Sequence, residues 1–412
     1  MEAYTSRDLV NISLEVASMN KDKNKWIEHV LYCKALLDSI HYGASSPFIP
    51  IYAIELGASP IEIGILYSLS NLSLNFFQVI WGYLSDRLIK YVMFIILGGF
   101  FSSITMAALL FVKSITVFIG LVTFHSMTAS MSIPTFVAYS SRLISEDRWR
   151  RFIENINSLS YLGWVLATLA VGLSSLLGLS GFSTGFSIAS ISGITGSIIT
   201  WIFCKELNVD PEEGYLPSIK TLRIRRCIKF LNFLVLSVSF GFFLSMAWPL
   251  FTITLTKISV LSLFDISILD IVFGLSGAAG LALIRDHLTL VKTSSILALS
   301  GSAMALIPLV YAFSPYLLSL VLIHALIGVF GALYDAASLA YVLENTPIEE
   351  KGVYTALYNF SVGSAFFCGS LVAGYILEIL QQSWSLEAAL TTLYIVTAVG
   401  RFVIGLLYRY LD

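Results

Sequence analysis

Apolar stretches long enough to cross a lipid bilayer follow one another through nearly all of this 412-residue chain. A membrane-spanning helix needs roughly 20 apolar residues. Charged residues make up only 12% of the chain and apolar residues 57%, whereas a soluble domain has about 25% charged residues. The chain therefore cannot build a water-facing surface, and we predict an integral membrane protein with little room for a soluble domain.

The stretches predict twelve membrane-spanning helices. Lipid provides no partners for free backbone groups, so only helices and closed barrels cross it. A barrel would need alternating polar and apolar positions, and these stretches are apolar on all sides. We therefore expect an all-α protein with spans at residues 30–53, 60–81, 92–112, 115–140, 155–178, 183–204, 230–255, 265–284, 294–312, 315–342, 354–379 and 386–410.

The distribution of basic residues predicts the orientation. Of the 24 Lys and Arg residues, 20 fall on the side that carries both termini. The other side has only Lys113 and Lys257, while Lys34 and Arg401 lie inside predicted spans. Basic loops face the cytoplasm, so we expect a cell-membrane protein with both termini cytoplasmic. Because 26 acidic residues balance the 24 basic ones, nucleic acid is not an expected partner.

An internal repeat divides the predicted helices into two halves. Four residue types recur at an offset of 199 or 200 in matching spans, which favours two parallel six-helix bundles. The pairs are Pro50 and Pro249, Asp86 and Asp286, His125 and His324, and Gly163 and Gly363. The expected organisation is a cytoplasmic tail at 1–28, a first bundle at 29–204, a cytoplasmic linker at 205–229 and a second bundle at 230–412.

Several functional classes lack their sequence signatures. The four cysteines have no C-x-x-C spacing, and the five histidines have no H-x-x-x-H or H-E-x-x-H spacing, so we expect no disulfide framework, metal or cofactor. The chain also lacks the G-x-x-x-x-G-K-[ST] motif that binds ATP, so we do not expect transport driven directly by ATP hydrolysis. Residues 1–28 have no apolar core of the kind that a signal peptide needs. We therefore do not expect an enzyme. The cysteines are Cys33, Cys204, Cys227 and Cys368.

The loop after the second span reads GYLSDRLIK, residues 82–90. In a chain of six plus six spans it resembles the G-x-x-x-D-R-x-G-R-R signature of the major facilitator superfamily. The sequence departs from that signature at Ile89, where the family usually has Gly, and at Tyr91, where a second basic residue is common. Residues 47–66 and 344–366 are also similar to stretches of the family, so the resemblance covers nearly the whole chain after residue 28. The matching residues are Gly82, Asp86, Arg87 and Lys90.

The resemblance implies a secondary transporter that alternates between inward-open and outward-open states. In the family the signature loop latches the halves in the outward-open state. Gly82 would let two helices approach closely, and Asp86 would bind a helix N-terminus or a basic partner. Arg87 and Lys90 would stay at the anionic cytoplasmic surface of the membrane as part of the latch, or they could serve only to set the topology.

Asp38 and His41 are the best candidate pair of functional residues inside the membrane. They lie three residues apart, on neighbouring positions of one helical face. Asp38 lies about 15 Å along the helix from Glu28, which places it near the middle of the bilayer. Ionisable groups at that depth are functional candidates, and a carboxyl group there could load and unload a proton. The alternative is a static acid paired with Lys34, one turn away.

Other candidates depend on the family architecture, in which spans 1, 4, 7 and 10 line a central cavity. Asp270 in span 8 has no basic neighbour in sequence, and Asn359 lies in span 11, which flanks the cavity. Lone histidines could instead be hydrogen-bonded packing residues. A polar stripe in span 2 favours interhelical hydrogen bonding over substrate contact. The cavity candidates are Asp38, His41, His125, Trp248, His324 and Asp335, and the stripe is Asn71, Asn75 and Gln78.

The residues leave the substrate open. We expect a monomeric carrier of a small molecule, coupled to protons, with efflux of lipophilic compounds favoured. Against the drug-antiporter branch, residues 121–129 read LVTFHSMTA and depart from its L-x-x-x-R-x-x-x-G pattern, and residues 158–172 lack its Gly-Pro pair. Spans 1, 4, 7 and 10 have no Arg for a strongly anionic substrate. A proton-coupled importer of a sugar or organic acid is therefore the alternative, and a non-transporting sensor is a remote one.

Overall fold

The computed structural model describes residues 6–204, 228–288, 291–347 and 350–411, and these residues form helices without any strand. This confirms the all-α membrane fold that the sequence predicts. The expected linker at 205–229, together with Cys227, lies almost wholly outside the described residues, as do residues 1–5 of the expected tail.

Eleven of the described helices are long and apolar enough to cross a membrane. The twelfth is α1 (Ser6–Ser45), whose mean hydropathy is lowered by charged and polar side chains such as Lys34 and Asp38. The other elements are α3 (Pro60–Leu88), α4 (Tyr91–Leu109), α5 (Ile115–Ala129) with α6 (Ser132–Leu143), α7 (Glu146–Leu176), α8 (Gly181–Cys204), α9 (Ile228–Ile253) with η2 (Thr254–Ile258), α10 (Leu263–Leu288), α11 (Thr293–Ala303) with α12 (Leu306–Phe313), α13 (Leu317–Glu344), α14 (Lys351–Leu380) and α15 (Leu386–Leu407) with η4 (Tyr408–Tyr410).

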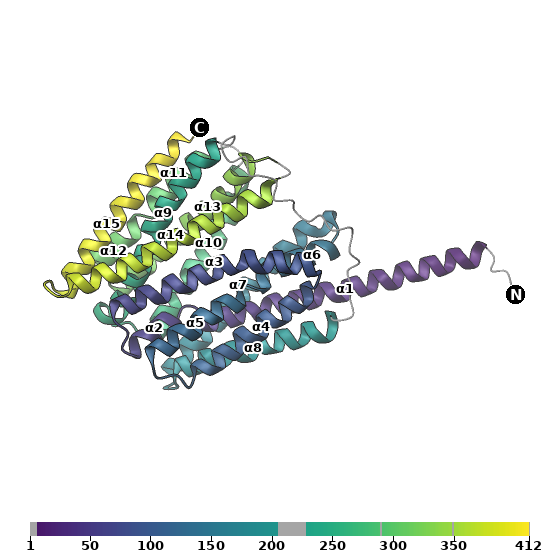
Figure 1. The fold of residues 1–412 in the computed structure, drawn as a ribbon, viewed down its shortest axis with the longest axis horizontal. Coiled ribbons are helices and arrows are strands. Elements are labelled where there is room, and N and C mark those ends of the chain that lie inside the picture. Colours follow the sequence, from purple (N-terminus) through teal and green to yellow (C-terminus); the bar gives the residue numbers. More distant parts are fainter. Residues whose placement is uncertain (1–5, 205–227, 289–290, 348–349, 412) are drawn as a thin grey trace.

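The first helix differs from the expected boundaries. It runs without a break from Ser6 and extends well beyond the rest of the bundle (Figure 1), so the described part of the expected tail is continuous with the first span. It ends at Ser45, and a short helix, α2 (Ile49–Glu55), completes the crossing. Pro50 lies in the first turn of α2, where its missing N–H is tolerated.

Prolines remove a backbone hydrogen bond from two spans of the second half, and side chains from other helices compensate. A proline at position i cannot bond the carbonyl of residue i−4. Pro308 therefore frees the oxygen of Met304, which accepts a hydrogen bond of 3.1 Å from Arg401. Pro249 frees the oxygen of Ser245, which accepts one of 3.1 Å from the Ser370 hydroxyl. Lipid cannot supply such partners, so each break depends on a neighbouring helix.

The helices pack as two groups that contact each other mainly through two helix pairs. In the first half α1 packs on α7 and α8, and α4 packs on α8. In the second half α13 packs on α10 and α11, and α9 packs on α14 and α15. The halves meet where α3 packs on α14 and α7 packs on α10. Figure 1 shows the two groups diverging toward the end that carries both termini.

The halves come closest at the end remote from the termini, which we call the closed end. There α3 and α14 approach through glycines. A Cβ atom on Gly64 would lie 2.7 Å from the Ser370 oxygen, and one on Gly374 would lie 2.5 Å from the Pro60 oxygen. Any larger side chain would force the backbones apart. The Ser68 hydroxyl also donates a 2.7 Å hydrogen bond to the Phe367 carbonyl across the same contact.

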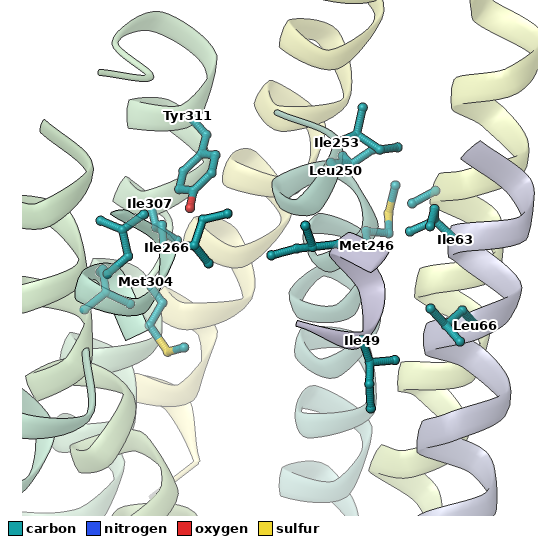
Figure 2. Close-up of a cluster of buried hydrophobic side chains, with 14 of the residues drawn as sticks. Ile49, Ile63, Leu66, Met246, Leu250, Ile253, Ile266, Met304, Ile307 and Tyr311 are labelled. Carbon is teal, nitrogen blue, oxygen red and sulfur yellow. The ribbon is translucent and has the colours of Figure 1, made fainter. Parts of the chain in front are cut away.

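One cluster of buried apolar side chains continues through the closed end from one half to the other. Figure 2 shows part of it, with Ile63 and Leu66 of α3 near Met246 and Leu250 of α9. The surrounding hydrocarbon is as apolar as these side chains, so the hydrophobic effect does not drive the helices together in lipid. Close van der Waals packing holds them instead. The closed end is therefore sealed by shape complementarity and by hydrogen bonds.

Gly374→Val should separate the halves at the closed end, because the new Cβ meets backbone atoms that cannot rotate away. With the four native cysteines replaced by serine, spin labels at Lys113→Cys and Lys257→Cys would report the separation. We expect longer distances in Gly374→Val than in the parent. Gly352→Val is the matched control on the same helix, since no heavy atom lies within 4 Å of its Cβ position. An unchanged distance distribution in Gly374→Val would contradict the tight contact.

Candidate functional site

Asp38 forms an ion pair with Lys34, one turn earlier on α1. The Lys34 side chain is 1% exposed, whereas that of Asp38 is 28% exposed. Lys34 lies among small residues of two other helices, and a Cβ atom on Gly99 of α4 would come within 3.3 Å of its Nζ atom. The pair that the sequence left open as an alternative is thus present, with the ammonium buried and the carboxylate accessible.

His41 and His125 come together in the first half. Their rings stack with centroids 5.3 Å apart, although one residue belongs to α1 and the other to α5. The Nδ1 atom of His41 lies 2.7 Å from the Ala189 carbonyl of α8, and the Nδ1 atom of His125 lies 3.2 Å from the Ser102 carbonyl of α4. Both residues are buried. The stacked pair therefore ties four helices of the first bundle together.

A pocket with a volume of about 260 Å³ opens beside these residues. Asp38, His41 and Tyr42 belong to its α1 wall, and α4, α5, α6, α7 and α8 contribute the remaining sides. The pocket belongs entirely to the first half. It brings Asp38 and His41 to one surface, as their spacing predicts.

Trp248 lies apart from that pocket, where α3, α9 and α14 converge. Its ring packs on Phe366 at a centroid distance of 4.9 Å and approaches Tyr67 at 6.2 Å. The Tyr67 hydroxyl lies 2.8 Å from the Thr252 hydroxyl of α9. This aromatic group therefore joins the two halves near the closed end.

Asp270 links the halves directly. The Trp164 indole of α7 donates a 2.5 Å hydrogen bond to the Asp270 carboxylate of α10. On the same pair of helices, Gly172 lets α7 approach Ser267, whose hydroxyl would lie 2.7 Å from a Cβ atom on that glycine. The partner of Asp270 is therefore an indole from the other bundle, 106 residues away in the chain.

The remaining candidates do not join the Asp38 pocket. His324 stays within the second half, with Nδ1 at 2.7 Å from the Leu320 carbonyl and Nε2 at 3.4 Å from the Tyr311 hydroxyl. Asp335 and Asn359 are exposed, on α13 and α14. Their contacts therefore lie in separate groups, and the single aqueous space expected for all the candidates stays a prediction.

The signature loop has a left-handed residue at the position where its sequence departs from the family pattern. Ile89, at the position of the usual Gly, has a left-handed conformation with φ of 52°, which glycine adopts more easily. Arg142 of α6 lies 4.6 Å above the ring of Tyr91. A basic group therefore lies beside the position where the family commonly has a second basic residue. Gly82 only makes ordinary contact with Pro134, at 3.5 Å from its Cβ position.

The charged residues of the loop are open to their surroundings in this conformation. Asp86, Arg87 and Lys90 are all exposed. None of them forms an ion pair within the described part of the chain. The contacts between the halves lie toward the opposite end of the bundle, so this end is separated while the closed end is joined.

The stripe on α3 points its amides along its own helix. The Asn71 side-chain amide donates a hydrogen bond of 2.8 Å to the Tyr67 carbonyl. The Asn75 side-chain amide donates one of 2.9 Å to the Asn71 carbonyl. Asn75 also packs against α14, where a Cβ atom on Gly363 would lie 2.7 Å from it. The stripe therefore contacts the other half by packing.

Two residues acquire roles that the sequence did not assign. Glu378 of α14 accepts a 3.0 Å hydrogen bond from the Ile61 amide in the first turn of α3, so a carboxylate of one half caps a helix of the other. Arg401 is 1% exposed and donates to the carbonyls of Phe243, Leu244 and Met304. Both residues lie inside predicted spans, where a charged group demands partners, but the sequence does not indicate which partners these are.

The sequence matches relatives over almost its full length. The profile of the Major Facilitator Superfamily matches residues 31–289. The Methanocaldococcus jannaschii proteins named as uncharacterized MFS-type transporters MJ1560 and MJ1317 are 22% and 23% identical to it over 92% of this chain and 96% of their own length.

Solved structures show the same fold. The nucleoside transporter NupG has a TM-score of 0.75 at 14% identity, covering 93% of this chain and 98% of its own. An auto-inhibited POT family peptide transporter scores 0.71 at 12% identity, covering 93% and 96%. A bacterial homologue of the human lysosomal transporter Spinster, in an inward-facing and unoccupied conformation, scores 0.72 at 13% identity, covering 94% and 96%.

The chain belongs to the major facilitator superfamily. It is a multi-pass membrane transporter with the fold of this family, and not an enzyme.

Trp164→Phe should destabilise the contact between α7 and α10, because it removes the indole donor and leaves the Asp270 carboxylate without its partner. A hydrogen bond to a charged group contributes about 1.5–3 kcal/mol. We expect a loss of that size in the free energy of unfolding in detergent. Trp384→Phe, at an exposed residue, should change it by less than about 0.5 kcal/mol. Equal effects of the two substitutions would mean that the interfacial hydrogen bond contributes nothing.

Proposed function

We propose that this transporter couples the movement of a small lipophilic compound to protons, and that Asp38 carries the coupling proton. The observation that carries the proposal is the asymmetric ion pair on α1, in which the ammonium of Lys34 is buried and the carboxylate of Asp38 faces a pocket. A proton or a solute can therefore reach the acid while its basic partner stays fixed.

The ion pair offers a physical route from proton occupancy to conformation. Protonating Asp38 would leave the buried Lys34 ammonium without a counter-charge. Breaking a buried pair in this way costs about 3–5 kcal/mol. A conformational change that brings water or another acceptor to Lys34 would recover part of that cost. The protonated and ionised states of Asp38 would then favour different arrangements of α1 and the helices beside it.

We further propose that the end carrying the termini faces the cytoplasm of the cell. Most Lys and Arg residues of the sequence lie at that end, as expected of cytoplasmic loops. With the opposite end closed and the charged residues of the signature loop exposed, the described conformation corresponds to an inward-facing state. The similarity to an inward-facing member of the family supports this assignment.

Import is the second candidate, and the first half supplies the observation that favours it. His125 occupies the place of the Arg that the drug-antiporter pattern requires, and its ring is buried against His41. A proton-driven importer of a polar metabolite would not need that Arg. The structural neighbours include transporters of nucleosides and of peptides, so a nucleoside is a useful probe of this candidate.

Asp38→Asn should abolish proton-driven transport and lower stability, because Lys34 loses its counter-charge. We expect the free energy of unfolding to fall by about 3–5 kcal/mol. Adding Lys34→Met should recover at least about half of that loss without restoring coupling. The transport measurement would use proteoliposomes under an imposed pH gradient, with ethidium as the lipophilic probe and uridine as the metabolite probe. The direction of movement relative to the gradient would separate export from import.

The double variant makes this test decisive. If the Lys34→Met, Asp38→Asn protein still moved ethidium or uridine in response to the pH gradient, the pair would be purely structural and the coupling role of Asp38 would be wrong. Lys34→Met alone completes the double-mutant cycle. It keeps the Asp38 carboxyl group, so transport should still respond to the gradient.

A further inference from the structure

The two helix pairs that join the halves differ in how far their contact extends. Along α3 and α14 the contact runs from the closed end past the middle of the membrane. It includes Gly64 near the closed end, and farther along a Cβ atom on Gly363 would lie 2.7 Å from Asn75. The rings of Phe76 and Phe360 then lie 6.2 Å apart between centroids. At 1.5 Å per residue, the stretch of α3 from Gly64 to Phe76 spans about 18 Å.

The contact between α7 and α10 ends sooner. It includes Gly172 against Ser267 and the hydrogen bond from Trp164 to Asp270. Gly274 follows Ser267 by seven residues, so it lies on the same face of α10. No heavy atom of α7 or any other described element lies within 4 Å of its Cβ position. Gly274 is about 16 Å from the start of α10, close to the middle of a hydrocarbon layer about 30 Å thick.

The facing side of α7 is uncovered over the same stretch. Tyr161 and Asn157 precede Trp164 by three and seven residues, and they share its helical face. Tyr161 is 41% exposed, and Asn157 is exposed as well. On α10, Ala278 follows Gly274 by one turn. Among the residues that the structure describes, these four border a space between the halves that continues toward the cytoplasmic end. We call it the α7–α10 gap.

The α7–α10 gap adjoins the pocket beside Asp38. Ile156 and Ser160 of α7 line that pocket. Asn157 and Tyr161 directly follow them in the chain, and successive residues of a helix are about 100° apart around its axis. The pocket-lining side of α7 and the side that borders the gap are therefore neighbouring strips of one helix surface.

We propose that the transported solute moves between the inner leaflet of the bilayer and this pocket through the α7–α10 gap, while the contact of α3 with α14 keeps the opposite side shut. A lipophilic compound concentrates in hydrocarbon because removing apolar surface from water is favourable, so a lateral route reaches it where it is most abundant. Gly274 and Ala278 place no bulky side chain in its way. The proposal rests on the proposed function for the inward-facing assignment and for the lipophilic nature of the solute.

The first test asks whether lipid enters the gap. Three glycines have no heavy atom within 4 Å of their Cβ positions, so each accepts a spin-labelled cysteine without a clash: Gly274, Gly120 on an exposed position of α5, and Gly352 at the cytoplasmic start of α14. The variants Gly274→Cys, Gly120→Cys and Gly352→Cys would be compared in nanodiscs, with the native cysteines replaced by serine. Oxygen, which dissolves in hydrocarbon, and a water-soluble nickel chelate would serve as the relaxing agents.

We expect the ratio of oxygen to nickel collisions at Gly274→Cys to be at least as high as at Gly120→Cys, because Gly274 lies deeper in the hydrocarbon. Gly352→Cys provides the low ratio of a label in water. A ratio at Gly274→Cys as low as that at Gly352→Cys would mean that water fills the space and lipid is excluded, which would overturn the proposal.

The second test blocks the gap. Gly274→Trp places an indole in the open space, so it should slow ethidium movement in proteoliposomes by about tenfold or more, both with a pH gradient and down an ethidium gradient alone. Gly120→Trp is the matched control, and its rate should stay within about twofold of the parent. The spin-label pair at Lys113→Cys and Lys257→Cys should keep the distance distribution of the parent in Gly274→Trp. An unchanged ethidium rate, or an altered distance distribution that accounts for the slowing, would refute the route.

The two proposals can fail separately. Ethidium transport that responds to the pH gradient but is equally fast in Gly274→Trp and the parent would keep proton coupling and remove the lateral route. Ethidium movement that ignores the pH gradient, yet is slowed by Gly274→Trp and not by Gly120→Trp, would keep the lateral route and remove the coupling.

Discussion

Backbone hydrogen bonding in a medium without water is the constraint on which the rest of this structure depends. Continuous helices satisfy it along most of the chain, and prolines violate it locally. The oxygens of Met304 and Ser245, freed by Pro308 and Pro249, each receive a side-chain donor from another helix. The breaks in the second half are therefore also crosslinks, and its helices are held by polar contacts at the positions where a single helix is weakest.

The two halves use their buried polar groups differently. In the second half Arg401 donates to three carbonyls and has a structural role. In the first half Asp38 and His41 line a pocket, with Lys34 and His125 buried beside them. The buried ion pair that adjoins a pocket therefore belongs to the first bundle, while the buried cation of the second bundle is used to hold its own helices together.

The sequence predicts the architecture better than the site. Hydropathy locates the spans because each must be apolar whatever it packs against, and the adjacency of Asp38 and His41 follows from helical spacing. Breaks within spans were not expected, although Pro134 and Pro308 mark them. The contacts of Trp164 with Asp270 and of Ile61 with Glu378 could not be predicted, because they join residues 106 and 317 positions apart. Such pairs depend on how the helices are placed, which periodicity within one helix does not determine.

The contact between Glu378 and the first turn of α3 bears on how easily the closed end can open. Both partners are polar and lie where the helices end, so water can replace each of them once the halves part. The net free energy of such an exchange is about 1.5–3 kcal/mol for a charged acceptor, less than the strength of the bond in isolation. A seal of this kind holds its geometry while joined yet imposes a low thermodynamic penalty on separation, which suits an equilibrium that must reverse in every cycle.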